Sequence, residues 1–185
     1  NTAVGKDALA SNTTGYDNVA VGRNALDANV GGHSNTALGE SSLTSNTEGD
    51  RNVAVGQNAM AVNTTGGENV AIGRNALDAN TTASYNVAVG DSTLTTNTTG
   101  AQNTAVGHAS MNANTTGAYN TAVGWQSMDA NTEGAENTGM GWGALGSNTT
   151  GGYNAAFGGG ALDANTTGAT NTAMGFKALS ANTTA

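Results

Sequence analysis

Residues 86–102 read NVAVGDSTLTTNTTGAQ, and residues 103–119 read NTAVGHASMNANTTGAY. These stretches are successive copies of one 17-residue unit, which starts first at Asn1 and recurs without insertion or deletion along the chain. The unit starts eleven times, with the approximate consensus N-[TV]-A-[VLIMF]-G-x-x-[AST]-[LM]-x-[AST]-N-T-[TE]-G-x-x. A fixed period is typical of stacked repeat architectures, because each unit must superpose on the one before it.

The residue types at fixed places in the unit, numbered here as positions 1 to 17, indicate strands rather than helices. Asn fills positions 1 and 12 and Gly fills position 5 in all eleven units. Position 9 is Leu or Met, position 4 is always apolar, and position 3 is Ala except at Gly139. A 17-residue unit is too short for a helix pair, and its recurring glycines disfavour helix. Val and Thr alternating with Ala at positions 2 to 4 are typical of a strand.

We therefore predict an all-β fold, a parallel β-solenoid or β-roll of eleven 17-residue coils, with two short strands and two turns per coil. Positions 2 and 4 should share one strand face, with position 3 on the other face, and positions 9 and 11 should form a second, inward-facing pair. Glycines at positions 5 and 15 mark the corners. At about 4.8 Å per coil, the rod would be roughly 50 Å long. Residues 1–185 should form a single array, and its lack of atypical caps predicts a segment of a longer fibre.

The composition excludes several classes of protein. Gly, Thr and Asn make up 83 of the 185 residues, whereas Leu, Ile, Val and Phe together make up 24. An ordinary globular core is therefore not expected. The chain has no cysteine, so disulfides and thiolate metal sites are excluded. Five Lys and Arg residues against a net charge of −8 argue against nucleic-acid binding. No apolar run is long enough to insert into a membrane.

With so few large apolar residues, stability should come from ladders of identical residues. An Asn amide donates and accepts simultaneously, so a stack of them can satisfy itself. We expect structural amide ladders at positions 1 and 12. The position-12 ladder comprises Asn12, Asn29, Asn46, Asn63, Asn80, Asn97, Asn114, Asn131, Asn148, Asn165 and Asn182.

The pentapeptide NVAVG at residues 18–22, 52–56 and 86–90, with NVAIG at residues 69–73, resembles the head repeats of trimeric autotransporter adhesins. That family carries a similar strand in each coil of a left-handed parallel β-roll, although its coil is shorter. The 17-residue repeats are also similar to those of phage and viral fibre proteins. The resemblance implies a homotrimeric extracellular fibre at a cell surface or on a virion.

The sequence shows no catalytic constellation, so no enzyme activity is predicted. His33 and His108 lie at different positions of units more than four coils apart. No Gly-Gly-x-Gly-x-Asp or Asp-x-Asp-x-Asp-Gly calcium motif occurs, and we predict neither a metal site nor a cofactor.

Position 6 of the later units carries a series of ring-bearing side chains. It comprises His108, Trp125, Trp142 and Phe176, interrupted by Gly159. Trp125 and Trp142 lie one coil apart, so their rings should stack along the rod. A solvent-facing aromatic stripe can bind a partner, and we predict a host or cell-surface ligand here, with a glycan as one candidate. The alternative is a packing contact or a tolerated surface aromatic.

A second surface feature is the threonine array at positions 13 and 14. A regular, uncharged Thr ladder resembles the ice-binding face of solenoid antifreeze proteins, which gives an alternative function. The predicted ice face comprises Thr13, Thr64, Thr81, Thr98, Thr115, Thr149 and Thr166. Adjacent Thr in a strand point to opposite faces, so only one position can form it. The structural alternative is turn chemistry, in which Thr hydroxyls bond nearby backbone.

The third feature is the alanine series at position 3, from Ala3 to Ala173. Small outward-facing side chains would allow another chain to approach closely, as in a trimer interface, or would simply leave a bare sheet face. Together these features predict a non-enzymatic rod, the structural or adhesive shaft or head of an extracellular fibre. Repetitive display of its surface would raise avidity for a multivalent partner.

Overall fold

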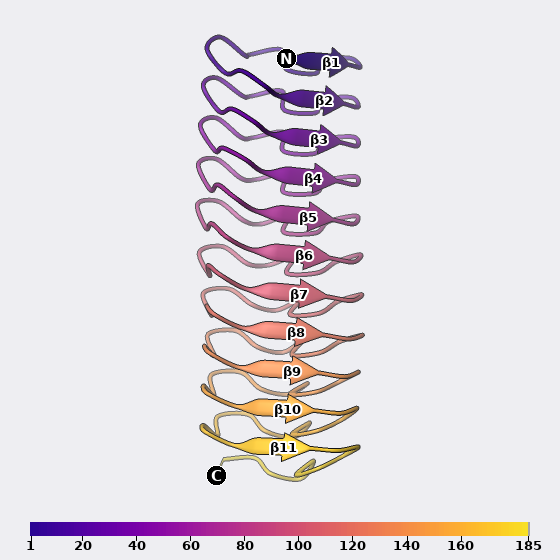
Figure 1. Cartoon of the computed structure of the whole chain (residues 1–185), viewed down its shortest axis with the longest axis vertical. Coiled ribbons are helices and arrows are strands. Elements are labelled where there is room, and N and C mark those ends of the chain that lie inside the picture. Colours follow the sequence, from indigo (N-terminus) through magenta and orange to yellow (C-terminus); the bar gives the residue numbers. More distant parts are fainter. Residues whose placement is uncertain (185) are drawn as a thin grey trace.

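The computed structural model describes residues 1–184 and shows them as a parallel β-solenoid (Figure 1). Each 17-residue unit forms one coil, and each coil contributes one three-residue strand. The strands are β1 (Thr2–Val4), β2 (Val19–Val21), β3 (Thr36–Leu38), β4 (Val53–Val55), β5 (Val70–Ile72), β6 (Val87–Val89), β7 (Thr104–Val106), β8 (Thr121–Val123), β9 (Thr138–Met140), β10 (Ala155–Phe157) and β11 (Thr172–Met174). The predicted fold class is confirmed.

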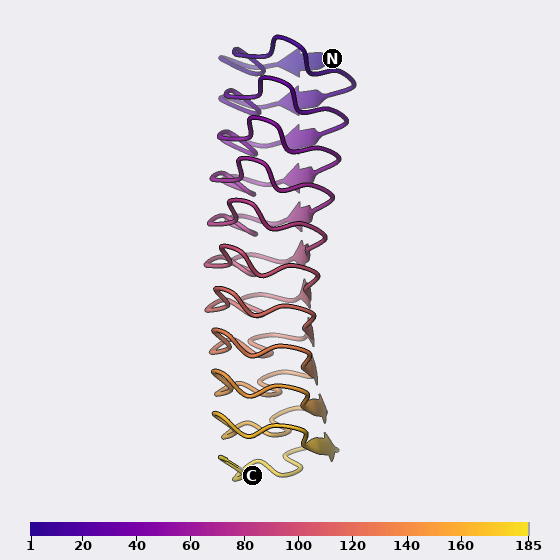
Figure 2. The same ribbon diagram turned by 90° about the vertical axis from the view of Figure 1, so that its left-hand side faces the viewer.

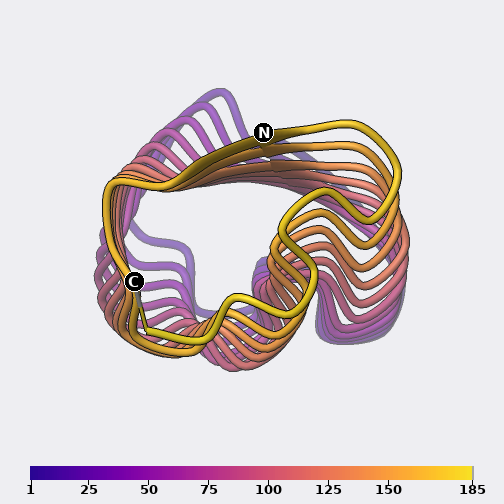
Figure 3. The same cartoon turned by 90° about the horizontal axis from the view of Figure 1, so that it is seen from below.

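The strands form an 11-stranded parallel sheet in which each strand pairs with its neighbours in sequence order. Pairing joins equal repeat positions, as where Ala88 of β6 lies opposite Ala105 of β7. Seen along the axis, the coils nearly superpose, and each is rotated slightly relative to the one before it (Figure 3). Figure 2 shows the strands following one another along one side of the rod. Residues 1–184 contain no helix long and apolar enough to cross a membrane.

The prediction of a second strand in each coil is wrong, because positions 5 to 12 form two successive turns. In the fifth coil the Ala76 N–H donates to the Gly73 carbonyl at 3.3 Å, and the Asn80 N–H donates to the Leu77 carbonyl at 3.1 Å. Asn75 and Leu77 have φ angles of 55° and 53°. Left-handed residues at every second position cannot form an extended strand. The turns are nevertheless linked to the next coil, since the Leu77 N–H donates to the Thr93 carbonyl at 3.0 Å.

The interior of each coil holds one large side chain faced by small ones. In the fifth coil Leu77, Ala71 and Ala76, at positions 9, 3 and 8, are all fully buried. The expected orientation of the strand is therefore wrong: Ala at position 3 points inward, and positions 2 and 4 point outward. The coil is narrow, so the strand can face the Leu or Met of position 9 only with a methyl group. Position 11 is not inward either, since Val62 is 45% exposed.

Candidate functional site

Position 6 immediately follows the glycine that ends each strand, in the turn that leaves the sheet. Gly124 and Gly141, which precede Trp125 and Trp142, have φ angles of 136° and 133°. A Cβ at Gly124 would lie 2.7 Å from the carbonyl carbon of Gly141, so only glycine fits this close approach between coils. The turn places Trp125 and Trp142 on the surface, where they are 54% and 49% exposed.

The tryptophan rings do not stack on one another as expected. Among the described residues, the ring contact of Trp142 is with Phe176, at a centroid distance of 6.2 Å and an interplanar angle of 51°. The intervening Gly159 allows this contact, because a side chain there would collide with the indole ring of Trp142. Trp142 therefore lies toward the tenth coil and away from Trp125.

A pocket of about 420 Å³ opens between the eighth and tenth coils. Its lining includes Trp125, Trp142, Asp129, Asp163, Gly143 and Gly146. Of the predicted ligand-binding residues, the structure brings Trp125 and Trp142 to this pocket. His108 and Phe176 do not line it. The acidic residues at position 10 were missed as part of this site, because they lie two coils apart and show no motif.

One carboxylate of the pocket, that of Asp129, lies in an environment that disfavours its charge. Burial raises the pKa of Asp129 above its usual range, and the nearby charge of Asp163 raises the same pKa further, partly opposed by hydrogen bonds to backbone. No Lys or Arg occurs between Arg74 and Lys177 in the sequence. The pocket therefore carries negative charge beside aromatic rings.

Position 6 of the first six coils carries charged side chains instead, except at Gln57. Arg23 pairs with Glu40 of the next coil, and Arg74 pairs with Asp91 at 3.1 Å. His108 lies 3.8 Å from the Asp91 carboxylate rather than with the aromatic residues. Hydrogen bonding and the charge of Arg74 hold the pKa of Asp91 below its usual range. The charged residues at position 6 of these coils form exposed ion pairs, which contribute little to stability.

The threonines of position 13 are used within the rod. The hydroxyl of Thr98 donates to the carbonyl of Thr115 at 3.1 Å, and Thr115 donates in turn to Thr132 at 3.0 Å. These position-13 side chains are half-buried, whereas Thr99 and Thr116 at position 14 are exposed. The regular hydroxyls that face solvent therefore belong to position 14.

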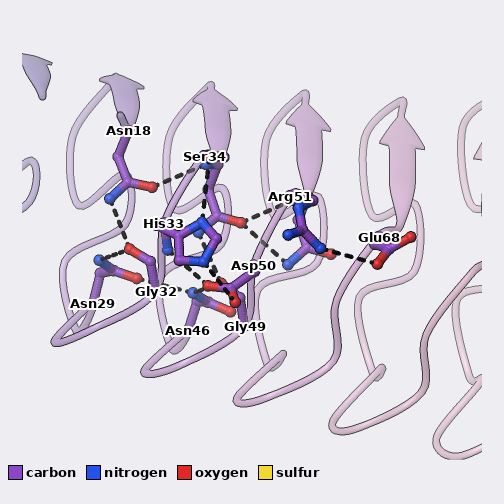
Figure 4. Close-up of polar contacts among 12 residues, drawn as sticks. Asn18, Asn29, Gly32, His33, Ser34, Asn46, Gly49, Asp50, Arg51 and Glu68 are labelled. Atoms are coloured by element: carbon purple, nitrogen blue, oxygen red, sulfur yellow. Dashed lines mark hydrogen bonds and ion pairs between the residues drawn. The ribbon is translucent and has the colours of Figure 1, made fainter. Parts of the chain in front are cut away.

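Two asparagines and the residue at position 15, which is Gly except at Ala83 in the first ten coils, close the coil at the corner between positions 12 and 1. Asn18 and Asn29 both donate from Nδ2 to the Gly32 carbonyl, at 2.8 and 3.0 Å (Figure 4). Asn46 donates to Asn29 Oδ1 at 3.0 Å, which continues the position-12 series as an amide ladder. Among the described residues, no buried side-chain nitrogen or oxygen lacks a hydrogen-bond partner. The ladders explain how polar Asn side chains can be buried in so narrow a core, because their hydrogen-bonding groups are all paired.

Outward-facing residues of the sheet form an apolar stripe that sequence reasoning missed. At position 4, Leu38, Ile72 and Met140 are 47%, 40% and 41% exposed, and at position 2 Val19 is 40% exposed. The signal was present in the sequence, since position 4 is apolar in all eleven units. It was assigned to the interior instead of the surface.

Comparison with known proteins adds no family. No protein-family model, curated protein or solved structure matches the chain. Within residues 1–184, no group of three or more His, Asp or Glu side chains is arranged to hold a metal ion.

Proposed function

We propose that this chain is a rigid, non-enzymatic rod, the shaft or head of an extracellular fibre in which three copies associate. The stacked solenoid is compatible with a structural role. The observation that supports association is the apolar stripe at position 4, which runs along the sheet from β1 to β11 and is flanked at position 2 by Val in four coils, Ala in one and Thr in six. Contiguous apolar surface of this kind is typical of protein–protein contacts. We therefore assign the proposed trimer interface to this stripe and not to the Ala series of position 3, which is buried.

Light scattering on the chain tests the association. The proposal predicts three times the chain mass of 18.1 kDa. Lysine at position 4, in Val89→Lys with Val106→Lys, should give monomers with an unchanged circular dichroism spectrum. The control is Thr99→Lys with Thr116→Lys, which places the same charges at exposed position 14 and should leave the trimer intact. A parent chain that is monomeric over the accessible concentration range would overturn the trimer.

The adhesive part of the proposal concerns the later coils. Half-exposed Trp125 and Trp142 offer aromatic surface to a ligand on a host or cell surface, and parallel association would present three such sites. Several weak sites on one rod raise avidity without new contacts. Loss of cell or glycan binding in Trp125→Ala with Trp142→Ala, with the fold retained, would support adhesion. Undiminished binding would contradict it.

A second function, ice binding, has one observation in its favour. Uncharged threonines at position 14 are exposed in successive coils, as at Thr65, Thr82, Thr99 and Thr116. The proposed ice face at position 13 is less suited, because its hydroxyls donate to the backbone of the next coil. Thermal hysteresis that disappears in Thr99→Lys would favour this function over the fibre. Absence of hysteresis in the parent chain would eliminate it.

A further inference from the structure

The pocket between the eighth and tenth coils exists because two side chains are missing from the ninth. Positions 7 and 10 of that coil are Gly143 and Gly146. A Cβ at Gly143 would meet no atom within 4 Å, so the space above it is open. A Cβ at Gly146 would lie 2.9 Å from Oδ1 of Asp163. The carboxylate of Asp163 therefore leans over Gly146, toward Asp129 of the eighth coil.

Aromatic rings form the other part of the lining. Trp125 and Trp142 both border the pocket, and both remain about half exposed. Phe176 and the bare backbone of Gly159 hold Trp142 toward the tenth coil. The two rings are thus separated, and the space between the coils is left open rather than filled by a ring stack.

No positively charged side chain among residues 1–184 forms an ion pair with the carboxylates of the pocket. Glu40, Glu68 and Asp91 pair with arginines elsewhere on the rod. Asp129 and Asp163 have no ion-pair partner among the described residues, although the pocket partly desolvates Asp129. Bringing two unneutralised carboxylates together costs free energy that a bound cation would recover.

We propose that this pocket binds a small organic cation, a substituted ammonium group. Such a group is attracted to the faces of tryptophan rings and to carboxylates at once. The volume lies within the range of small-molecule sites. An anionic ligand would be repelled by Asp129 and Asp163, and a neutral one would bury their charges without compensation. The site lies at positions 6 to 11, away from the apolar stripe at position 4, so it does not depend on trimer formation.

Tryptophan fluorescence reports on this site alone, because Trp125 and Trp142 are the two tryptophans of the chain. Choline chloride should change the emission saturably. The uncharged isostere 3,3-dimethylbutan-1-ol should give no saturable change at the same concentrations. An equal response to the neutral isostere, a response to calcium chloride but not to choline, or no response to choline would each overturn the proposal.

Variants separate the site from the rest of the rod. Asp129→Asn with Asp163→Asn should weaken choline binding at least about tenfold, since both charges act on the cation. Asp78→Asn, at the same position 10 of the fifth coil, is the matched control and should leave binding unchanged. Gly143→Asn fills the pocket with the residue that other coils carry at position 7, as at Asn58 and Asn75. It should fold and lose binding. Unchanged affinity in the double variant or in Gly143→Asn would overturn the assignment.

Discussion

Asn114 donates from Nδ2 to Oδ1 of Asn97 at 2.7 Å, and this bond joins two coils through residues 17 apart in sequence. Asn97 itself donates to Oδ1 of Asn80 at 3.3 Å and to the Gly100 carbonyl at 2.9 Å. Asn97 thus links its coil to the preceding one and also hydrogen-bonds the corner of its own coil. A fully buried chain of such bonds makes the rod sensitive to the loss of any one member.

Asn97→Leu should lower the free energy of unfolding by about 1–3 kcal/mol, because buried partners lose hydrogen bonds. Urea denaturation followed by circular dichroism measures the loss. Asn112→Leu is the control: its side chain is half-buried and makes no hydrogen bond among the described residues. Equal stability of Asn97→Leu and the parent would show that position 12 is not a buried ladder.

Ala105→Leu should destabilise the rod by about 1–3 kcal/mol, because a larger side chain overpacks a closed core. Ala105 is fully buried against the interior of its coil. Thr104→Leu, one residue earlier on the outward face, should have little effect on unfolding of the isolated coil stack. The comparison, made by thermal melting, decides which face of the strand is inside. If Ala105→Leu left stability unchanged, position 3 would face outward, as the sequence had suggested.

Gly107→Ala should be among the most damaging small substitutions, costing at least about 2 kcal/mol through backbone strain and collision. Gly107 has a φ of 130°, and its Cβ would lie 2.7 Å from the carbonyl carbon of Gly124. Gly152→Ala is the matched control, since Ala101, Ala118 and Ala135 occupy the same position 16 in other coils. Denaturation curves that coincide for the two variants would contradict the assigned corner geometry.

Asp78→Asn should stabilise the protein at neutral pH, by less than about 1 kcal/mol because this half-buried site is still partly screened by solvent. Burial raises the pKa of Asp78, so the protonated form favours the fold. That contribution is present below the ordinary Asp pKa and is lost as pH rises through the raised value. The advantage of the variant should therefore vanish in acid, as thermal melting against pH will show.

Asp91→Asn should have the opposite effect on stability at neutral pH. Arg74 lowers the pKa of Asp91, so its stabilising contribution is present above the ordinary Asp pKa and is lost as pH falls through the lowered value. At neutral pH this variant should be less stable than the parent, not more. Shifts of the same sign in the two variants would contradict the assigned environments.

Periodicity predicted the fold class, because the 17-residue register forces equal positions to superpose. It also located the glycine corner at position 5 and the buried Leu or Met at position 9. It could not say which strand face is inside, since alternation is symmetric. The answer depends on the cross-section of the coil, in which Leu77 leaves room only for Ala71. The prediction of a second strand failed for a similar reason. Leu77 has a positive φ, and nothing about leucine as a residue type indicates this conformation.

The candidate site was predicted only in part. Trp125 and Trp142 were visible as neighbouring aromatics, but their separation depends on Gly159 and Phe176, which are in the next two coils. Asp129 and Asp163 looked like unrelated surface acids. Both line the pocket because Gly146, between them, has no side chain and the carboxylate of Asp163 occupies the space beside it.

The most direct test of the stacked solenoid is a pair of spin-label distances. The chain has no cysteine, so Thr65→Cys with Thr150→Cys labels exposed position 14 of the fourth and ninth coils uniquely. Dilution with unlabelled chain removes distances between copies. Five coils predict a narrow distribution near about 24 Å, and Thr65→Cys with Thr167→Cys, one coil further, should add about 5 Å. Broad distributions, or no difference between the two pairs, would contradict a rod that advances one strand spacing per 17 residues.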